Sequence, residues 1–391
     1  MKRLLLPALL LTTLTACTAA PADTLPAAVP TPTPASTPAP TAAPAPADAL
    51  TPEEKIGQLF IIRPDALDLT LPQETINDAK ADGVTMLTDA MRETLQAYPV
   101  GGICQFGKNI TDPEQLAQFN ADLQAASRTP LFIAVDEEGG AVARLANHPA
   151  FDLPQYESAA AVGASGDPAD ACAMGQTIGA YLKEYGFNMD FAPDADVNTN
   201  PDNPIIGTRA FSSDAATAAE MAAAAADGLR TSGILPTLKH FPSHGDTAED
   251  SHTALAVTYK TLDELQACEL LPFAADTGLH AVMVGHIAAP NVTGDGTPAT
   301  LSPQLVALIP DAENPLIVTD SLAMDAITAA YTPGEAAVQA LQAGCDVLLM
   351  PNSLPEAYAA VLEAVQNGTI SEERLDRSVN KILLYKQQFV S

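Results

Sequence analysis

Basic residues are scarce in this sequence. Lysine and arginine together number 18, against 48 aspartates and glutamates, and the formal net charge is −30. A nucleic-acid partner requires a basic surface, which this composition does not supply. The same acidity argues against direct binding to an anionic membrane surface, and its simplest consequence is solubility. We therefore expect no nucleic acid among the partners.

Cysteine is also scarce, with five residues in 391. Four of them lie far apart in apolar surroundings, namely Cys104, Cys172, Cys268 and Cys345. This wide spacing predicts buried free thiols and no disulfide or zinc framework.

The N-terminal apolar run, Leu4–Leu14, is too short for a permanent transmembrane helix, which needs about 20 residues. Two basic residues precede the run and small residues follow it, as in a cleaved signal peptide. The motif Leu-Thr-Ala-Cys that ends at Cys17 resembles the bacterial lipoprotein signal, in which the cysteine becomes the lipidated N-terminus. We predict a signal peptide over 1–16 and lipidation of Cys17. The alternative is ordinary secretion with an incidental cysteine.

Residues 17–49 are nearly all alanine, proline and threonine after the cysteine. Such a segment cannot bury a core and favours extended polyproline II backbone. At about 3.1 Å per residue it can hold a domain up to about 100 Å from a membrane. We predict a disordered linker and an extracytoplasmic protein that meets the membrane through its lipid anchor only.

Residues 50–391 contain no second linker and no internal repeat of 20–50 residues. A (β/α)8 barrel commonly takes about 250 residues, and more with insertions. One catalytic domain is therefore the simplest organisation, and we expect a monomer.

Short apolar runs recur along this domain, and helical patterns follow them. The candidate strands are Ile56–Ile62, Gly101–Phe106, Leu131–Glu137, Phe187–Pro193, Ile234–His240, Ala281–His286, Leu316–Thr319 and Asp346–Met350. Runs without polar alternation are typical of parallel strands buried on both faces. Eight strands that alternate with helices predict an α/β fold, a single (β/α)8 TIM barrel. The alternative is an open doubly wound sheet, but the glycine-rich dinucleotide turn that it requires is missing.

The helical patterns include Pro113–Ala126, Ala169–Tyr185, Asp214–Thr231, Thr261–Thr277 and Pro355–Gln366. The segment Arg63–Val100 is long for a loop after a first strand, and it contains a further helical pattern at Asp89–Gln96. We interpret it as a decorated first β/α unit that shapes the substrate cleft or covers a barrel end.

Polar residues gather where the candidate strands end, which is the active face of a barrel. The richest segment is Lys239–His252, which holds three of the six histidines. Its first part continues a strand, while its second part is a loop rich in glycine, serine and threonine. One residue separates Asp250 from His252, so the carboxylate can accept a hydrogen bond from the imidazole and favour its protonated form. A histidine held in this way can donate a proton near neutral pH.

The segment Lys239–His252 resembles the signature of glycoside hydrolase family 3 in its β-N-acetylhexosaminidase branch. That pattern is Lys-His-Phe-Pro-Gly-His-Gly-Asp-Thr followed by Asp-Ser-His, and Ser243 replaces its glycine. Four further segments are similar to those of the family, namely Gly101–Asn109, Asp136–Gly140 with Arg144, Asn203–Phe211 and Val318–Met324. The resemblance covers Leu50–Ser391.

The resemblance implies a role for each matching residue. Asp320 aligns with a nucleophile that forms a covalent glycosyl-enzyme in a retaining reaction. His252 aligns with the acid/base, and Asp250 orients it. The positions that match sugar-binding residues are Asp136, Arg144, Arg209, Lys239 and His240. Glu137 and Glu138 match residues that support the site without transferring protons.

The expected activity is that of a retaining exo-β-N-acetylglucosaminidase, without metal or organic cofactor. The carbohydrate substrates would be peptidoglycan fragments or chitooligosaccharides with terminal N-acetylglucosamine. One rival is a metal hydrolase with His240, His244, Asp246 and His252 as ligands, which the cationic Lys239 disfavours. The others are a non-catalytic lipoprotein that binds muropeptides, and a β-glucosidase or phosphorylase of the same family.

Overall fold

The computed structural model describes residues 46–249, 251, 254–276 and 278–390. The predicted signal peptide, Cys17 and the linker up to residue 45 lie outside this range, as do Asp250 and His252. None of the described helices is both long enough and apolar enough to cross a membrane.

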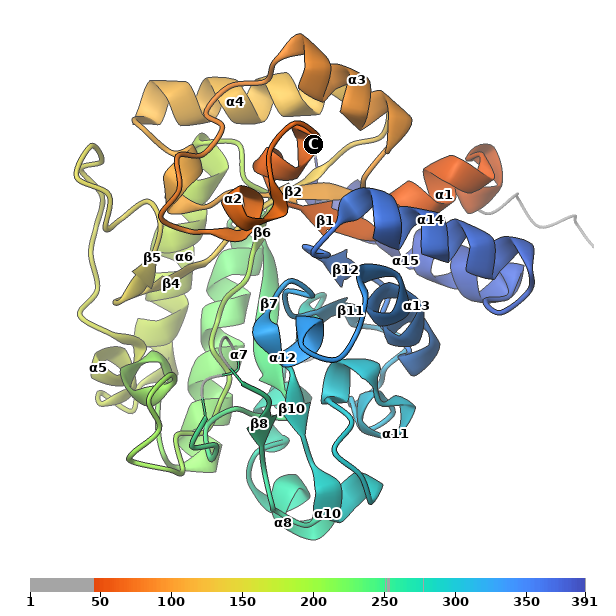
Figure 1. The fold of residues 1–391 in the computed structure, drawn as a ribbon. Helices are drawn as coiled ribbons and strands as arrows, with labels where there is room; N and C mark the ends of the chain where they lie inside the picture. The colour runs from red at the N-terminus through yellow and green to blue at the C-terminus, as the bar shows by residue number, and fades with distance from the viewer. Residues whose placement is uncertain (1–45, 250, 252–253, 277, 391) are drawn as a thin grey trace, which may run out of the picture. The chain divides into compact units, whose positions relative to one another are not determined.

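Eight parallel strands form the central barrel (Figure 1). They are β1 (Phe60–Ile62), β2 (Gly102–Cys104), β3 (Phe132–Val135), β6 (Met189–Asp190), β7 (Leu235–Phe241), β9 (Ala281–Val284), β11 (Leu316–Thr319) and β12 (Leu348–Leu349). Their order is β11-β9-β7-β6-β3-β2-β1-β12. A parallel bridge between Val318 and Val347 joins the two ends of this order. The predicted TIM barrel is therefore confirmed, and the open sheet is not formed.

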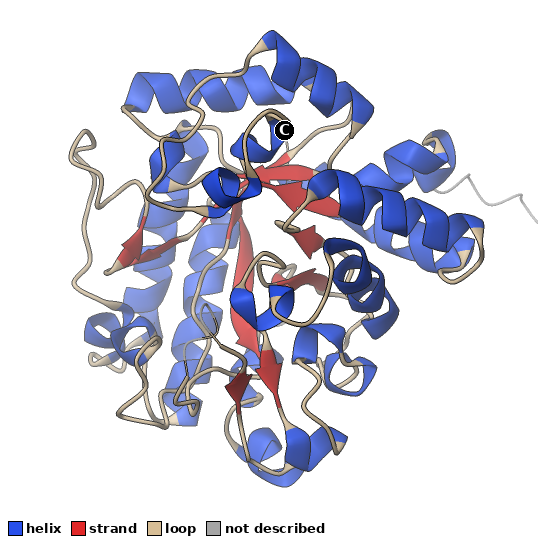
Figure 2. Cartoon of the chain, in the orientation of Figure 1, coloured by secondary structure: helices blue, strands red, loops and turns tan. Residues whose placement is uncertain are grey.

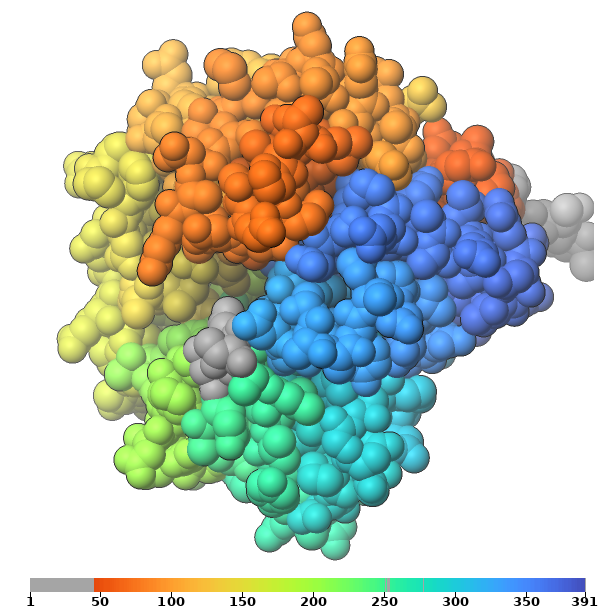
Figure 3. All heavy atoms as spheres, viewed as in Figure 1, coloured from red at the N-terminus to blue at the C-terminus, as the bar shows by residue number. Residues whose placement is uncertain are grey.

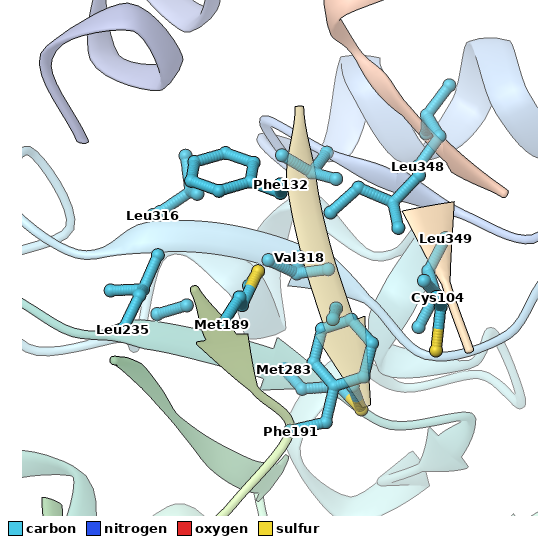
Figure 4. Close-up of a cluster of buried hydrophobic side chains, with 14 of the residues drawn as sticks. Cys104, Phe132, Met189, Phe191, Leu235, Met283, Leu316, Val318, Leu348 and Leu349 are labelled. Carbon is cyan, nitrogen blue, oxygen red and sulfur yellow. The ribbon is translucent and has the colours of Figure 1, made fainter. Parts of the chain in front are cut away.

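The barrel interior is filled by apolar side chains from strands all around the barrel (Figure 4). Phe132, Met189 and Leu235 come from the adjacent strands β3, β6 and β7, and Leu316 and Leu348 come from the neighbouring strands β11 and β12. All residues of β3, β9 and β11 are buried, as continuous apolar runs predict. The interior is thus a packed core, and binding is left to the ends of the strands.

Helices surround the strands (Figure 2). The α-helices are α1 (Pro52–Gln58), α2 (Gln73–Asn77), α3 (Asp89–Ala97), α4 (Pro113–Ala126), α5 (Ala159–Gly163), α6 (Pro168–Glu184), α7 (Ala215–Thr231), α8 (Leu262–Ala267), α9 (Leu271–Ala275), α10 (Pro290–Thr293), α11 (Pro303–Val306), α12 (Asp325–Thr328), α13 (Pro333–Ala343), α14 (Leu354–Gln366) and α15 (Glu372–Phe389). Short 3-10 turns are η1 (Pro46–Ala49), η2 (Pro64–Leu67), η3 (Gly107–Asn109), η4 (Gly207–Arg209) and η5 (Ala299–Leu301). Two small sheets lie apart from the barrel, β4 (Glu137–Gly139) with β5 (Val142–Ala143), and β8 (Ala256–Val257) with β10 (Ile287–Ala288).

Several predicted strands are shorter in the structure, such as Phe187–Pro193, which forms a strand at Met189–Asp190, and two further elements differ in kind. The strand predicted from Ile56 begins only at Phe60, because Thr51 and Glu54 form a capping box that starts α1. The helix predicted from Thr261 is two short helices, α8 and α9. Pro272 lies in the first turn of α9, where its missing N–H costs nothing, whereas within a continuous helix it would break a hydrogen bond.

The four described cysteines are free, as predicted, but two of them, Cys172 and Cys268, are half-buried and not buried.

The long segment after β1 contains η2, α2 and α3, and α3 confirms the helical pattern at Asp89–Gln96. Lys108 holds the end of α2, since its Nζ donates to the carbonyl oxygens of Thr75 and Ile76 at 2.9 and 3.0 Å. Asn77 donates through Nδ2 to Oδ1 of Asn352, at 2.6 Å, in the loop after β12. Figure 3 shows the orange surface of this segment against the blue surface of the C-terminal residues. The segment therefore adjoins the mouth of the barrel.

Helix α15 covers the opposite end, where the strands begin. The Tyr385 hydroxyl donates to the carbonyl oxygen of His280, just before β9, at 3.0 Å. Asp346, which precedes β12, accepts hydrogen bonds from Ser378 and Lys381 of α15 at 2.5 and 2.8 Å. These contacts hold the last helix on the barrel.

Candidate active site

A cavity of about 250 Å³ lies at the C-terminal ends of the strands. Its lining includes six of the predicted site residues, namely Asp136, Arg144, Arg209, Lys239, His240 and Asp320. Phe106, Phe191, Met283 and Met324 add apolar walls. A cavity with convergent polar groups and apolar walls is typical of a small-molecule site.

Lys239 is the centre of a buried ion network. Its Nζ lies 2.8 Å from Oδ1 of Asp136 and 2.7 Å from Oε1 of Glu138. Glu138 also accepts two hydrogen bonds from Arg209, from Nε at 2.8 Å and from NH2 at 2.7 Å. Arg144 approaches Asp136 more loosely, with NH2 3.7 Å from Oδ2. The neighbouring ends of β3 and β7 bring Asp136 and Lys239 together, although these residues lie 103 positions apart in the chain.

These pairings decide which groups are charged. Burial alone would raise the pKa of Asp136, but the cations of Lys239 and Arg144 outweigh it and hold that pKa below its usual value. The same balance lowers the pKa of Glu138, here through Arg209 and Lys239. Burial opposes the charge of Lys239, yet Asp136 and Glu138 raise its pKa above the ordinary value. The network is therefore fully ionised at neutral pH and offers charged partners to sugar hydroxyls.

His240 is oriented by a carboxylate. Its Nδ1 donates to Oδ2 of Asp196 at 2.7 Å, and its Nε2 lies 3.5 Å from NH2 of Arg209. Burial would raise the pKa of Asp196, but His240 lowers it. The pKa of neighbouring Asp194 is raised well above its usual value by burial and by the charge of Asp196. The Asp196 contact fixes the tautomer of His240, which also lines the cavity.

Asp194, Asp196 and His240 also lie close enough together to hold a metal ion. Carboxylate and imidazole ligands would suit such an ion. However, Nδ1 of His240 already donates to Asp196, and the Arg209 guanidinium lies 3.5 Å from Asp194. A fixed cation at that distance opposes a second one, so the cluster is explained as part of the ion network.

Asp320 directly follows β11 and reaches the same cavity. Its N–H donates to the carbonyl oxygen of Val284 at 2.8 Å, and its Oδ1 accepts from the N–H of Ser321 at 2.7 Å. His286 supports the following residue, since its Nε2 lies 2.8 Å from the carbonyl oxygen of Ser321. These contacts set the direction of the Asp320 carboxylate.

The segment after β7 returns to the cavity through Ser251. The Ser251 hydroxyl lies 3.0 Å from Nε2 of His244, and the Thr247 hydroxyl lies 2.5 Å from Nδ1 of the same ring. The N–H of His244 donates to Oδ1 of Asp196 at 2.6 Å. Ser251 stands between the two predicted members of the acid/base pair, Asp250 and His252, which lie outside the described residues.

Glu137 organises the β4–β5 hairpin. Its carboxylate accepts hydrogen bonds from the N–H groups of Arg144, Leu145 and Ala146 at 2.5, 2.9 and 2.8 Å, and from the Tyr181 hydroxyl at 2.9 Å. It therefore fixes the backbone that carries Arg144.

Sequence reasoning left several polar residues out of the candidate site, although the structure places them at the cavity or beside it. Glu138 bridges Lys239 and Arg209, and Asp196 orients His240. Arg63 and Ser251 line the cavity. The rule that polar residues at strand ends mark the site could have found Arg63 and Glu138, which directly follow the candidate strands Ile56–Ile62 and Leu131–Glu137.

Comparison with known proteins gives a consistent result. Residues 51–384 match the model described as the glycosyl hydrolase family 3 N-terminal domain. The chain is 32% identical over 335 residues to β-hexosaminidase A of Pseudoalteromonas piscicida, covering 78% of this chain and 56% of that protein. It is 32% identical over 366 residues to β-hexosaminidase LpqI of Mycobacterium tuberculosis, covering 86% of this chain and 83% of the relative.

A solved structure of a family 3 β-N-acetylglucosaminidase from Paenibacillus sp. is 38% identical, with a TM-score of 0.76. The match covers 87% of this chain and 63% of the Paenibacillus chain. The chain thus spans little more than half of the Pseudoalteromonas protein and less than two thirds of the Paenibacillus one.

Proposed function

The chain belongs to glycoside hydrolase family 3, and from that premise we propose that it is a retaining exo-acting β-N-acetylglucosaminidase. It removes terminal β-linked N-acetylglucosamine from peptidoglycan fragments or chitooligosaccharides. The observation that carries the proposal is the single cavity in which Asp320 faces the ionised network around Lys239. A carboxylate nucleophile beside charged hydroxyl-binding groups is the arrangement that glycoside hydrolysis requires.

In the proposed reaction, Asp136, Arg144, Arg209, Lys239 and His240 bind the hydroxyls of the terminal sugar. The Asp320 carboxylate attacks the anomeric carbon and forms a covalent glycosyl-enzyme as the glycosidic oxygen leaves. His252, oriented by Asp250, gives its proton to that oxygen. The same imidazole then takes a proton from water, which attacks the anomeric carbon and releases Asp320.

The substrate assignment is tested with the full-length protein on paired p-nitrophenyl glycosides. We expect clear release of p-nitrophenol from the β-N-acetylglucosaminide and little from the β-glucoside. Equal or faster cleavage of the glucoside would remove the assignment. No turnover of either compound would favour a binding lipoprotein, and a sugar phosphate product in phosphate buffer would favour a phosphorylase.

The two catalytic roles have separate tests. Asp320→Ala is expected to abolish turnover, and a fluorosugar inactivator with a good leaving group is expected to label Asp320 in the unmodified enzyme. His252→Ala should slow substrates with poor leaving groups more than those with good ones, because protonation matters most there. Equal losses for both classes would contradict His252 as the acid.

A chelator should leave the rate of the unmodified enzyme unchanged, whereas a metal hydrolase would lose activity.

The proposed location has its own test. A signal peptide over 1–16, lipidation of Cys17 and a linker over 17–49 would hold the enzyme outside the cytoplasm at the end of a tether. Cys17→Ala should move the protein from the membrane fraction to the soluble fraction without changing its activity. Unchanged membrane association would contradict the lipid anchor.

A further inference from the structure

Arg63 lines the cavity, and the charges of Asp65 and Asp136 act on it from beyond ion-pair distance. In the closed order of eight strands, β1 lies four places from β7, so Arg63 stands across the mouth from the Lys239 network. Lys239 and Arg209 each pair with buried carboxylates. For Arg63, by contrast, the structure records no ion pair within the described part of the chain. Its neighbour Asp65 is engaged with Lys108 and Asn109.

Contacts with two neighbouring side chains hold Arg63 in position. Its NH1 donates to Oδ1 of Asn77 at 2.6 Å, and its guanidinium carbon lies 4.8 Å from the centroid of the Phe106 ring. Asn77 is in turn held by Asn352, and Lys108 holds the end of α2. The long segment after β1 therefore fixes the guanidinium against the cavity wall, which gives this segment a function.

Arg63 has a cationic neighbour. The Arg144 guanidinium lies 5.9 Å from the same Phe106 ring, and its side chain is one third exposed. Burial lowers the pKa of Arg63, so the protein bears a cost to keep this cation where it is. In a chain with a net charge of −30, a local cationic wall is also what an anionic ligand would need to approach.

We propose that Arg63 is a substrate-binding residue that recognises a carboxylate on the sugar next to the scissile bond. The planar guanidinium matches a carboxylate in a two-point geometry, whereas a neutral sugar offers it only hydroxyls. The enzyme therefore selects glycans in which N-acetylglucosamine precedes an acidic sugar, such as a muramic acid ether, over chitooligosaccharides. This inference rests on the proposed function and specifies its substrate.

The test compares two disaccharides with the full-length enzyme. Both carry terminal β-linked N-acetylglucosamine, linked in one to N-acetylmuramic acid and in the other to N-acetylglucosamine. Arg63→Gln is expected to lower kcat/KM about 10-fold or more on the acidic disaccharide, mainly through KM, because a charge-assisted contact is lost. The neutral disaccharide and the p-nitrophenyl glycoside should change less than about 3-fold. Arg63→Lys should recover part of the loss, and Arg128→Gln, an exposed arginine far from the cavity, should change neither.

A second measurement leaves the enzyme unchanged. Converting the carboxylate of the acidic disaccharide to its methyl ester should reproduce the loss in the unmodified protein but add little to Arg63→Gln. An equal loss on both disaccharides, or no preference for the acid over its ester, overturns the role of Arg63. Those results leave the proposed function standing if the p-nitrophenyl β-N-acetylglucosaminide is cleaved. Failure to cleave that glycoside would remove the proposed function itself.

Discussion

Both ends of the barrel bury ionic side chains in the described part of the chain, and those at the C-terminal end line the cavity that contains Asp320. At that end Lys239 lies between Asp136 and Glu138, and the network lines a space of about 250 Å³. At the other end Asp346 pairs with Lys381 at 2.8 Å and lies 3.7 Å from Arg374, beneath α15. Burial of charge alone therefore does not identify a site. The open cavity with Asp320 on its wall is what separates the two ends.

The two ends also differ in how well their cations are compensated. Lys239 has two carboxylate partners and a raised pKa. Lys386, on α15, is also buried; among the described residues its Nζ has polar contact with Oε1 of Gln58, at 2.6 Å, and lies 5.3 Å from the centroid of the Phe132 ring. Burial lowers the pKa of Lys386 to about 7. The C-terminal end of the barrel, here called the active end, pairs its ionic groups so that they stay charged. The end beneath α15, here called the closed end, contains a lysine, Lys386, that is close to losing its proton.

The largest expected effect is at the active end. Lys239→Met leaves the carboxylates of Asp136 and Glu138 facing each other without their shared cation. Removal of a cation that is proposed to bind the sugar, and displacement of its two carboxylates, should lower kcat/KM on the order of 10² or more. The measurement is kcat/KM on p-nitrophenyl β-N-acetylglucosaminide. Retention of a tenth of the activity or more would show that the network is only structural.

Asp346→Asn is the matched change at the closed end. It leaves Lys381 and Arg374 without their carboxylate, so we expect the free energy of unfolding to fall by about 3–5 kcal/mol. The measurement is urea unfolding at pH 7, with kcat/KM per folded molecule as the control. A change of more than about threefold in kcat/KM would break the distinction between the two ends.

Much of the scaffold was predictable because its signals are local. The strand Leu316–Thr319 and the helix Pro113–Ala126 have the predicted bounds, since an apolar run and an Asp112 cap followed by proline specify them. The polar ends of the strands drew attention to Asp136, Lys239 and Asp320, which line one cavity, but their roles came from the family resemblance and stay predictions. The partners were not predictable, because Glu138 and Arg209 lie 71 positions apart in the chain and Arg63 is held by Asn77 and Phe106. The roles of Asp250 and His252 stay predictions.

Lys386→Met tests the uncompensated cation. The pKa of Lys386 is about 7 in the folded protein and 10.5 ordinarily, so between these values the unfolded chain binds more protons. The free energy of unfolding should therefore rise as pH increases through this window, by roughly 2 kcal/mol from about pH 7.5 to 9 from this group alone. Lys386→Met should lose this pH dependence, and its gain in free energy of unfolding over the unmodified protein should be largest at or below pH 7. Parallel pH profiles of stability for the two proteins would contradict the lowered pKa.

Ser243→Gly has the smallest expected effect and lies at the active end. Ser243 is buried and has φ +136°, a region that favours glycine, and the family pattern has glycine there. Relief of this strain is worth about 1–3 kcal/mol, offset in part by the greater freedom of glycine in the unfolded chain, so we expect a net gain of roughly 0.5–1 kcal/mol. The Ser243 hydroxyl accepts only a 3.3 Å hydrogen bond from Gly245, and its loss should cost little. Ser243→Ala removes the same hydroxyl but keeps the side-chain carbon, so it should give no gain in urea unfolding. If Ser243→Gly lowers the free energy of unfolding as much as Ser243→Ala does, the Ser243 hydroxyl stabilises the protein by more than the backbone strain destabilises it. The serine at this position would then favour folding despite its positive φ.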